Sequence, residues 1–206
     1  MTLSAPDAAA LRRLLIDRLS RPATRDTGFT ADLDMAPEGT LVRDAAVLIP
    51  IVTRASPQVL LTLRPDHLPR HPGQIAFPGG QIDPGDASAE AAALREAQEE
   101  VGLEPRFVDV VGTLAPFVTG TGHRIAPIVG LVDPAYALKI DAREVVEAFE
   151  VPFDFLMNRA HHVRRSGEFR GRTRSFYEMT FGRHRIWGVT AGILVELCQT
   201  LDMEAP

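Results

Sequence analysis

One stretch of this chain constrains its fold more than any other, residues 79–103. Its second half, from about residue 87 to residue 101, is rich in Ala, Glu, Leu and Gln and has no interior Gly or Pro, which predicts a helix. Asp86 and Ser88 are both suitable N-cap residues, and Gly102 lies where the helix is expected to end. The stretch therefore predicts a helix that directly follows a glycine-rich turn.

Three carboxylates of this helix share one face. Glu96, Glu99 and Glu100 have the spacing that brings Cβ atoms to roughly 5 to 6 Å on a helix, and Arg95 can reach Glu99 at i+4. A solvated acidic face is the ordinary interpretation of such a run of like charges. Clustered oxygen ligands are also what Mg²⁺ or Mn²⁺ requires, and a bound cation would relieve the repulsion between them.

The surroundings of the carboxylates favour the second interpretation. We expect the opposite face of the helix, with Ala91, Leu94 and Val101, to pack on a sheet. The turn before the helix reads FPGG at residues 77–80, and its glycines let the backbone approach a ligand closely. Together these features predict a site for a metal ion and a phosphate group.

The residues of the helix resemble the Nudix box. Residues 95–103 read REAQEEVGL, and the box ends in REUXEEXGU, where U is a bulky aliphatic residue. Two positions depart from it. Ala97 is small where a larger aliphatic residue is usual, and Asp86 lies nine residues before Arg95, where the common pattern has a Glu eight residues before.

The upstream stretch resembles the signature of the coenzyme A pyrophosphatase branch of the same family, LLTxR[SA]xxxRxxxGxxxFPGG. The residues that agree are Leu60, Leu61, Thr62, Arg64, Gly73 and the FPGG of residues 77–80. The chain departs at Pro65, where Ser or Ala is expected, and at Pro69, where Arg is expected and Arg70 follows one position later. These departures weaken the substrate assignment but leave the family assignment intact.

The resemblance extends, more weakly, over about residues 45–201, and it implies an α/β fold. The expected architecture is an α/β/α sandwich with a mixed sheet and an acidic catalytic helix. We expect Glu96, Glu99 and Glu100 to bind Mg²⁺ or Mn²⁺ as the cofactor and Arg95 to orient them, with Glu99 and Arg95 counted as catalytic.

The segment before the glycine turn carries three prolines, which predicts a loop. Arg64 and Arg70 are suited to bidentate phosphate contacts, and His71 could add a hydrogen bond or a charge. With the backbone of Gly79 and Gly80, they form the predicted substrate-binding set. A solvated basic loop is the alternative interpretation.

A further acidic residue outside the box often serves the resembled family as a metal ligand or a general base. Glu144 is our candidate for the general base, in a segment 142–149 that we expect to be a short helix. Glu147 and Glu150 are alternatives, and each of the three could equally be a surface carboxylate.

The rest of the chain is expected to form one domain around this helix. We divide the sequence into an N-terminal helix and connecting segment (1–39), a Nudix hydrolase domain (40–201) and a tail (202–206). The other expected elements are an amphipathic helix at 7–19, a buried strand pair at 45–52 and 58–63, strands at 107–114 and 125–132, and a helix at 190–201. Basic and aromatic residues alternate over 161–177, which favours an edge hairpin that turns at Gly167 or Gly171 over a nucleic-acid surface.

Composition narrows the class of protein. With 206 residues, 45% of them hydrophobic and 24% charged, the chain can bury a core, and its net charge of −5 argues against a general nucleic-acid binder. No apolar run is long enough for a membrane span, and the single cysteine, Cys198, excludes an intramolecular disulfide. We expect a cytoplasmic protein with a small-molecule substrate and no membrane or nucleic-acid partner, as a monomer or a homodimer.

Three functions are compatible with these residues. The first is cleavage of the diphosphate of coenzyme A and its thioesters to 3′,5′-ADP and a 4′-phosphopantetheine product, which the upstream signature implies. The second is hydrolysis of another nucleoside diphosphate derivative, such as ADP-ribose, NADH or a dinucleoside polyphosphate. The third is a ligand-binding domain without turnover, although a pure binder has no need of three mutually repelling carboxylates.

Overall fold

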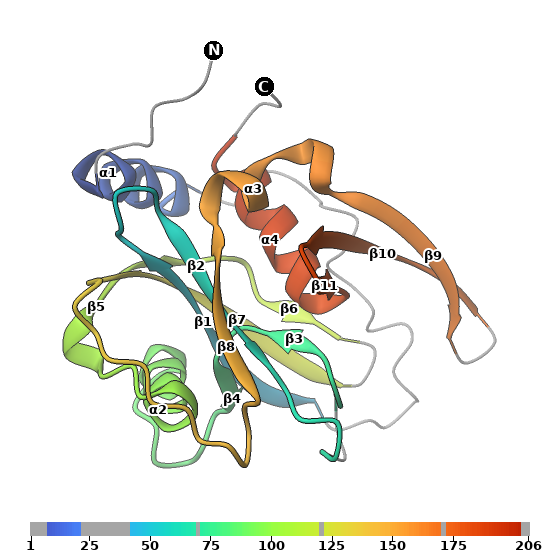
Figure 1. The fold of residues 1–206 in the computed structure, drawn as a ribbon, viewed down its shortest axis with the longest axis horizontal. Coiled ribbons are helices and arrows are strands. Elements are labelled where there is room, and N and C mark those ends of the chain that lie inside the picture. Colours follow the sequence, from blue (N-terminus) through green and yellow to red (C-terminus); the bar gives the residue numbers. More distant parts are fainter. Residues whose placement is uncertain (1–7, 22–41, 69–70, 120–121, 170–171, 203–206) are drawn as a thin grey trace.

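The computed structural model describes residues 8–21, 42–68, 71–119, 122–169 and 172–202. Figure 1 shows a twisted sheet with helices on both of its faces. In chain order the elements are α1 (Ala8–Leu19), β1 (Arg43–Val52), β2 (Gln58–Leu63), β3 (Ile75–Ala76), β4 (Gly79–Gln81), α2 (Ala89–Val101), η2 (Pro105–Phe107), β5 (Val108–Thr113), β6 (Phe117–Val118), β7 (His123–Val132), β8 (Glu147–Pro152), α3 (Phe153–Met157), η3 (Arg159–His161), β9 (Val163–Phe169), β10 (Arg172–Phe181), β11 (His184–Trp187) and α4 (Val189–Thr200).

The main sheet is mixed. Its order is β3-β2-β1-β7-β5, with β4 paired to β1, β6 to β7 and β8 to β2. The pair β1 and β7 is parallel, and the other pairs are antiparallel. Pro50, which has no N–H to donate, lies in β1 between the stretch paired with β4 and the stretch paired with β2. The predicted strand pair at the start of the domain is confirmed as β1 and β2.

The alternating residues of the central strands divide the core between two layers. Ala46, Leu48 and Leu60 pack on the side of α2, while Ile49 and Leu61 pack in the cluster that includes residues of α1, α3 and α4. A smaller sheet of order β11-β10-β9 adjoins α4 (Figure 1). The expected α/β/α sandwich with a mixed sheet is therefore confirmed.

Helix α2 begins and ends close to the predicted positions. Ser88 is the N-cap and its hydroxyl accepts from the N–H of Ala91, and Gly102 ends the helix in the left-handed conformation with φ 72°. Val101 is buried as expected, but Ala91 and Leu94 are only partly buried, so the predicted packing face is wrong in part.

The buried face of α2 is made instead of small residues. Ala92, Ala93 and Ala97 are all fully buried between the helix and the sheet. Short side chains let the helix axis lie close to β1 and β4, which it contacts. The small residue at position 97, a departure from the Nudix box, therefore lies in this contact.

One local prediction is wrong, and one of two alternatives is excluded for another. Residues 142–149 are not a helix, because the chain turns at residues 142–144 and then enters β8, whose residues pair along the whole of β2. Of the two glycines predicted for the hairpin turn, Gly167 is excluded, because it lies inside β9 opposite Arg174 of β10, and Gly171 lies outside the described residues. The predicted hairpin itself is confirmed, with Phe169 pairing with Arg172 at its far end.

Helix α1 belongs to the packed core. Leu11 and Leu15 are fully buried and join the same hydrophobic cluster as the central strands. The proposed boundary between residues 39 and 40 lies outside the described residues, so the division of the chain into segments stays a prediction.

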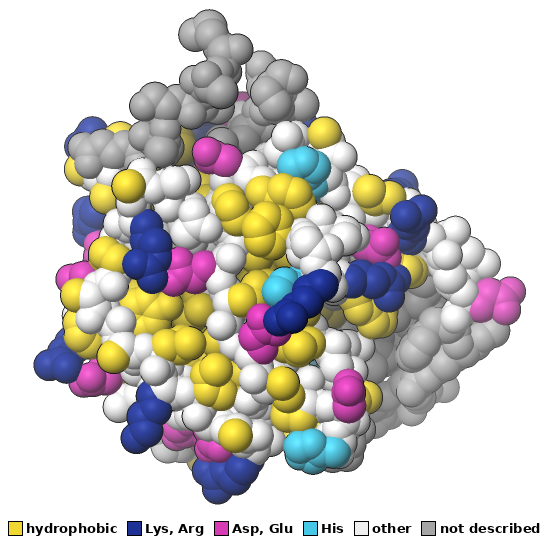
Figure 2. All heavy atoms as spheres, viewed as in Figure 1, with side chains coloured by type: hydrophobic (Ala, Val, Ile, Leu, Met, Phe, Trp, Pro, Cys, Tyr) yellow, Lys and Arg dark blue, Asp and Glu magenta, His cyan; other side chains and the backbone are white. Residues whose placement is uncertain are grey.

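The surface and the helices add two observations. Figure 2 shows acidic and basic side chains interspersed on the face that it presents, so the basic residues there do not form one continuous patch. None of the helices in the described ranges has the length and apolar character of a membrane span.

Candidate active site

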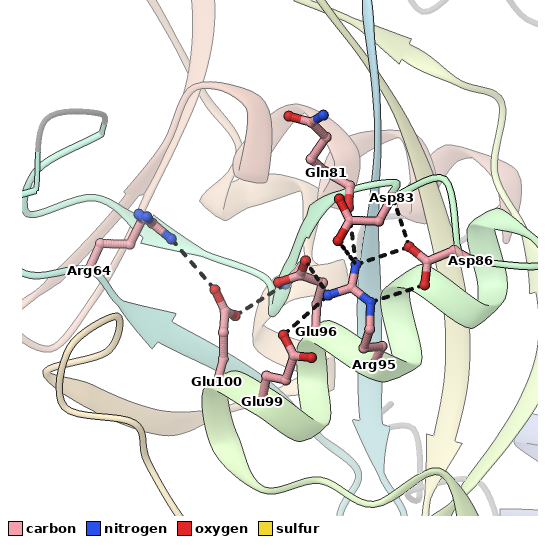
Figure 3. A network of polar contacts seen from close by, with 9 residues as sticks. Arg64, Gln81, Asp83, Asp86, Arg95, Glu96, Glu99 and Glu100 are labelled. Atoms are coloured by element: carbon pink, nitrogen blue, oxygen red, sulfur yellow. Dashed lines mark hydrogen bonds and ion pairs between the residues drawn. The ribbon is translucent and has the colours of Figure 1, made fainter.

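The site is built around the guanidinium of Arg95, which projects from α2 toward β4 and the loop that follows it (Figure 3). Nη1 donates to Glu96 at 2.9 Å and to Glu99 at 3.2 Å, and Nη2 donates to the carbonyl oxygen of Gln81 at 3.2 Å. The predicted contact from Arg95 to Glu99 is therefore present. A planar guanidinium with five donors can hold several acceptors at fixed angles, which one ammonium group cannot do.

Asp86 is the strongest partner of Arg95. Its two oxygens accept from Nε and Nη2 at 3.0 Å each, and one of them also accepts from the backbone N–H of Asp83 at 2.8 Å. The hydrogen bonds from Arg95 hold the pKa of Asp86 below its usual range and raise the pKa of Arg95. The sequence offered Asp86 as a possible helix cap or as the displaced acidic residue of the box, and the structure places it at the far side of the guanidinium.

Glu100 is the most buried of the three helix carboxylates, with 3% of its surface exposed. One oxygen accepts from the backbone N–H of Gly79 at 3.2 Å, and the other lies 3.6 Å from Nη1 of Arg64. Burial, joined by repulsion from Glu96 and Glu144, raises the pKa of Glu100 to about 8. The glycine turn and the upstream loop thus meet the acidic helix at this carboxylate.

Glu96 lies beside the second glycine of the turn. A Cβ atom at Gly80 would lie 2.5 Å from the carboxyl carbon of Glu96, so only glycine leaves room for this carboxylate. A Cβ atom at Gly79 would lie 2.6 Å from Cα of Val47 in the neighbouring strand. Burial raises the pKa of Glu96, against the opposing effect of Arg95.

Glu99 is the most exposed member of the set, with 59% of its side chain accessible. Within the described residues, no group of three or more His, Cys, Asp and Glu side chains is arranged to hold a metal ion. Their present contacts explain why the carboxylates do not converge on one point. Glu96 and Glu99 accept hydrogen bonds from Arg95, and Glu100 accepts one from the N–H of Gly79. The carboxylate oxygens are hard ligands that suit Mg²⁺ or Mn²⁺. To bind such an ion, they would have to give up these hydrogen bonds.

Glu144 lies on the segment that passes the C-terminal end of α2. The N–H of Asp141 donates to the carbonyl of Glu100, and the N–H of Val146 donates to the carbonyl of Leu63, next to Arg64. Glu144 is exposed, and its charge acts on both Glu96 and Glu100. The structure thus brings Glu144 near the helix carboxylates.

Glu147 and Glu150, the two alternatives to Glu144, are bound to arginines. Glu147 accepts two hydrogen bonds from Arg183, and Glu150 accepts two from Arg54. Their carboxylates are therefore occupied by arginines outside the α2 cluster.

The predicted loop contributes one residue to this cluster. Arg64 lies at Glu100, and its Nε is buried without a hydrogen-bond partner. His71 is exposed and its Nδ1 lies 2.8 Å from Oε1 of Gln74, a contact within the loop, so the structure does not bring it to the carboxylates. Arg70 lies outside the described residues.

Sequence reasoning missed two backbone contacts of the site, although it had named the backbone of Gly79 as a substrate-binding group. The carbonyl of Gln81 orients Arg95, and the N–H of Gly79 fixes Glu100. Neither has a side-chain signal, because backbone groups are common to all residues and only the fold decides which of them face the site.

Known proteins resemble this chain in sequence and in fold. The NUDIX domain family matches residues 42–169. The uncharacterized Nudix hydrolase NudL of Enterobacter sp. (strain 638) is 40% identical over 162 residues, which cover 79% of this chain and 84% of that protein. NudL of Escherichia coli (strain SMS-3-5 / SECEC) is 44% identical over 166 residues with the same coverage. The crystal structure of a NUDIX hydrolase from Alicyclobacillus acidocaldarius superposes with a TM-score of 0.47 at 20% identity, over 58% of this chain and 82% of that one.

The match to the family covers more than half of the chain, and both NudL relatives are well above 30% identity over most of their length. The box residues from Arg95 to Gly102 lie on the helix and the turn where the resemblance placed them. The chain therefore belongs to the Nudix family, as a hydrolase of a nucleoside diphosphate derivative.

Proposed function

We propose that this enzyme is a metal-dependent diphosphatase of coenzyme A and its thioesters, with 3′,5′-ADP and a 4′-phosphopantetheine compound as products. The observation that carries the proposal is the position of Arg64, the arginine of the coenzyme A signature. Its guanidinium lies 3.6 Å from the buried Glu100 and carries a buried Nε without a hydrogen-bond partner. The side chain of Arg64 is 24% exposed, so the guanidinium beside the carboxylates is suited to a phosphate oxygen of the substrate.

Glu96, Glu99 and Glu100 are the proposed ligands of Mg²⁺ or Mn²⁺. Burial, joined by repulsion from neighbouring carboxylates, raises the pKa values of Glu96 and Glu100 despite their contacts with Arg95 and Arg64. A divalent cation relieves that repulsion, neutralises phosphate oxygens and lowers the pKa of a bound water. Arg95 keeps Glu96 and Glu99 in place through its link to Asp86.

Glu144 is the proposed general base. It is exposed, lies near Glu96 and Glu100, and has no hydrogen bond or ion pair to any side chain in the described part of the chain. Its carboxylate would take the proton of the attacking water. The water oxygen forms a bond to one phosphorus, the bridging P–O bond breaks, and the departing phosphate keeps the electron pair.

A second substrate class has its own support. Pro65 and Pro69 replace residues of the coenzyme A signature, so another nucleoside diphosphate derivative, such as ADP-ribose, NADH or a dinucleoside polyphosphate, is the alternative substrate. A ligand-binding domain without turnover is the remaining alternative, and the complete carboxylate set with its orienting arginine speaks against it.

The test measures product release from coenzyme A, acetyl-coenzyme A, dephospho-coenzyme A, ADP-ribose, NADH and a diadenosine polyphosphate, with Mg²⁺ or Mn²⁺ and with chelator. We expect metal-dependent formation of 3′,5′-ADP from coenzyme A. Turnover confined to ADP-ribose, NADH or the diadenosine polyphosphate would contradict coenzyme A as the substrate but keep the family chemistry. Equilibrium binding without any turnover would favour the binding domain.

A matched pair of variants tests the role of Arg64. Arg64→Ala should raise the KM for coenzyme A by about tenfold or more, since a charge-assisted phosphate contact is lost. Arg12→Ala removes an exposed arginine of α1 that pairs with Asp109, and it should leave the kinetics unchanged. Equal kinetics for wild type and Arg64→Ala would show that Arg64 does not bind substrate.

A further inference from the structure

Strand β9 leaves one of its two edges unpaired in the described part of the chain. It is the outermost strand of the small sheet, and its registered partner there is β10. Residues 163–168 are all exposed, and Figure 1 shows the β9–β10 hairpin projecting away from the main sheet. An exposed strand edge of this length offers a row of N–H and C=O groups to another strand.

The sequence of β9 restricts which strand can pair there. It reads VRRSGEF, with the basic pair Arg164 and Arg165 before Ser166 and the acidic Glu168 after it. If a second copy of β9 runs antiparallel to the first with Ser166 opposite Ser166, Arg164 of each copy lies opposite Glu168 of the other. The pairing would therefore bring together two identical pairs of opposite charge.

Symmetry leaves few other registers. Two copies of one strand that pair antiparallel in a continuous sheet are related by a two-fold axis perpendicular to that sheet. A given residue then points to the same face of the sheet in both copies, and residues that lie opposite each other also share a face. Even-numbered residues therefore oppose even-numbered ones, and the axis runs between the two copies of one residue. An axis at Arg164 or Arg165 sets an arginine opposite itself, and an axis at Gly167 sets Ser166 opposite Glu168. Among these registers, the one centred on Ser166 pairs opposite charges.

The two charged residues that this register pairs, Arg164 and Glu168, are not engaged by other described side chains. Arg165 lies 3.6 Å from Glu178 on the other face of the hairpin, an ion pair within the chain. Neither Arg164 nor Glu168 has a hydrogen bond or ion pair to another side chain within the ranges that the structure describes. The face that carries Arg164 and Glu168 is therefore free to form pairs with a second molecule.

We infer that two copies of this chain form a homodimer through antiparallel pairing of their β9 strands, centred on Ser166, with Arg164 of each copy against Glu168 of the other. The two three-stranded sheets then join into one continuous sheet. The unpaired edge of β9 becomes an internal position in that sheet, and each of its free backbone groups gains a partner.

Charge exchange tests the interface in solution. Sedimentation velocity of the wild-type enzyme over the micromolar range should show twice the chain mass of 22.5 kDa. Glu168→Arg and Arg164→Glu should each raise the dimer dissociation constant by about tenfold or more, since like charges then face each other twice. The double variant with both exchanges should restore the dimer. Glu90→Arg, a charge change of the same size at an exposed position of α2, is the control and should dimerise like wild type.

Disulfide trapping tests the register. Ser166→Cys should give a covalent dimer on mild oxidation, because the two-fold axis sets this position opposite itself. Arg164→Cys alone should not, but an equal mixture of Arg164→Cys and Glu168→Cys should. The native Cys198 is buried and does not compete for a partner.

Two outcomes would overturn the inference. A wild-type monomer at all concentrations would leave β9 as an edge protected by its charges or open to a strand of a different protein. A dimer that is unchanged by both charge exchanges, in variants whose circular dichroism matches wild type, would place the interface elsewhere.

Discussion

Asp86 holds Arg95 through both carboxylate oxygens, each 3.0 Å from a guanidinium nitrogen. The same guanidinium donates to Glu96 and Glu99, so one arginine links the loop after β4 to two carboxylates of α2. The orientation of those carboxylates therefore depends on a residue that contacts neither of them.

Asp86→Asn should reduce kcat by about 10- to 100-fold, because a support residue behind proposed metal ligands is lost. Steady-state kinetics with varied Mg²⁺ or Mn²⁺ would measure this effect. Asp83→Asn is the control, since Asp83 lies 3.7 Å from Arg95 in an exposed position and its loss should cost much less. Equal losses in the two variants would contradict the specific role of Asp86.

Gly80→Ala should displace the carboxylate of Glu96, because the added Cβ would lie 2.5 Å from its carboxyl carbon. We expect the metal concentration for half-maximal activity to rise by about tenfold or more. Gly85→Ala in the next loop is the matched control, since a Cβ there meets nothing within 4 Å. An unchanged metal requirement in Gly80→Ala would remove Glu96 from the ligand set.

Glu144→Gln should lower kcat by about 100-fold or more at neutral pH if Glu144 is the general base. The amide keeps the size of the side chain but cannot accept the proton. Glu147→Gln should retain activity, because Glu147 is bound to Arg183 rather than directed to the helix carboxylates. The pH–rate profiles of both variants identify the base, and a greater loss in Glu147→Gln would reverse the assignment.

Glu196 links stability to pH. It is 7% exposed on α4, and burial raises its pKa above the ordinary value of 4.5. The folded chain therefore holds this proton more tightly than the unfolded chain, so the contribution of Glu196 to stability is present below pH 4.5 and is lost as pH rises through the folded-state pKa. Glu196→Gln should raise the Tm above that of wild type at pH 8, with a difference that vanishes toward pH 4.5. A Tm difference that is constant with pH would contradict this, and Glu90→Gln is the exposed control.

Leu15→Ala should reduce the free energy of unfolding by about 2–5 kcal/mol, since Leu15 is fully buried in the main core. Its neighbour Ile16 is 37% exposed, and Ile16→Ala should cost much less. Chemical denaturation measures both. A small effect of Leu15→Ala would contradict the place of α1 in the packed core.

Much of the fold follows from local sequence patterns. The strands β1 and β2 are nearly continuous apolar runs, and α2 has its N-cap at Ser88 and its C-terminal glycine at Gly102, so each is defined by its own residues. The segment at 142–149 was predicted wrongly because its outcome depends on β2, a distant strand that it pairs with. The packing face of α2 was wrong in part for the same reason, since the sheet selects Ala92 and Ala93 by their size.

In the candidate site, too, some contacts follow from local sequence and others depend on tertiary packing. The contact from Arg95 to Glu99 follows from helix geometry, whereas the contacts of Arg95 with Asp86 and of Glu100 with Gly79 depend on how the loop and β4 lie against α2. The unequal burial of Glu99 and Glu100, neighbours in the sequence, also comes from tertiary packing.

The segment before β8 is joined to the C-terminal end of α2 by two backbone hydrogen bonds, from Lys139 to Val101 and from Asp141 to Glu100, and Ile140 packs against the core layer that contains Val101. Such bonds do not depend on side-chain identity, so a residue such as Lys139 can change in evolution while Glu144 keeps its position relative to the helix. The length of this segment cannot drift in the same way, because an insertion between Asp141 and Glu144 would move that carboxylate away from the helix. Selection in this lineage should therefore conserve spacing here more strictly than sequence.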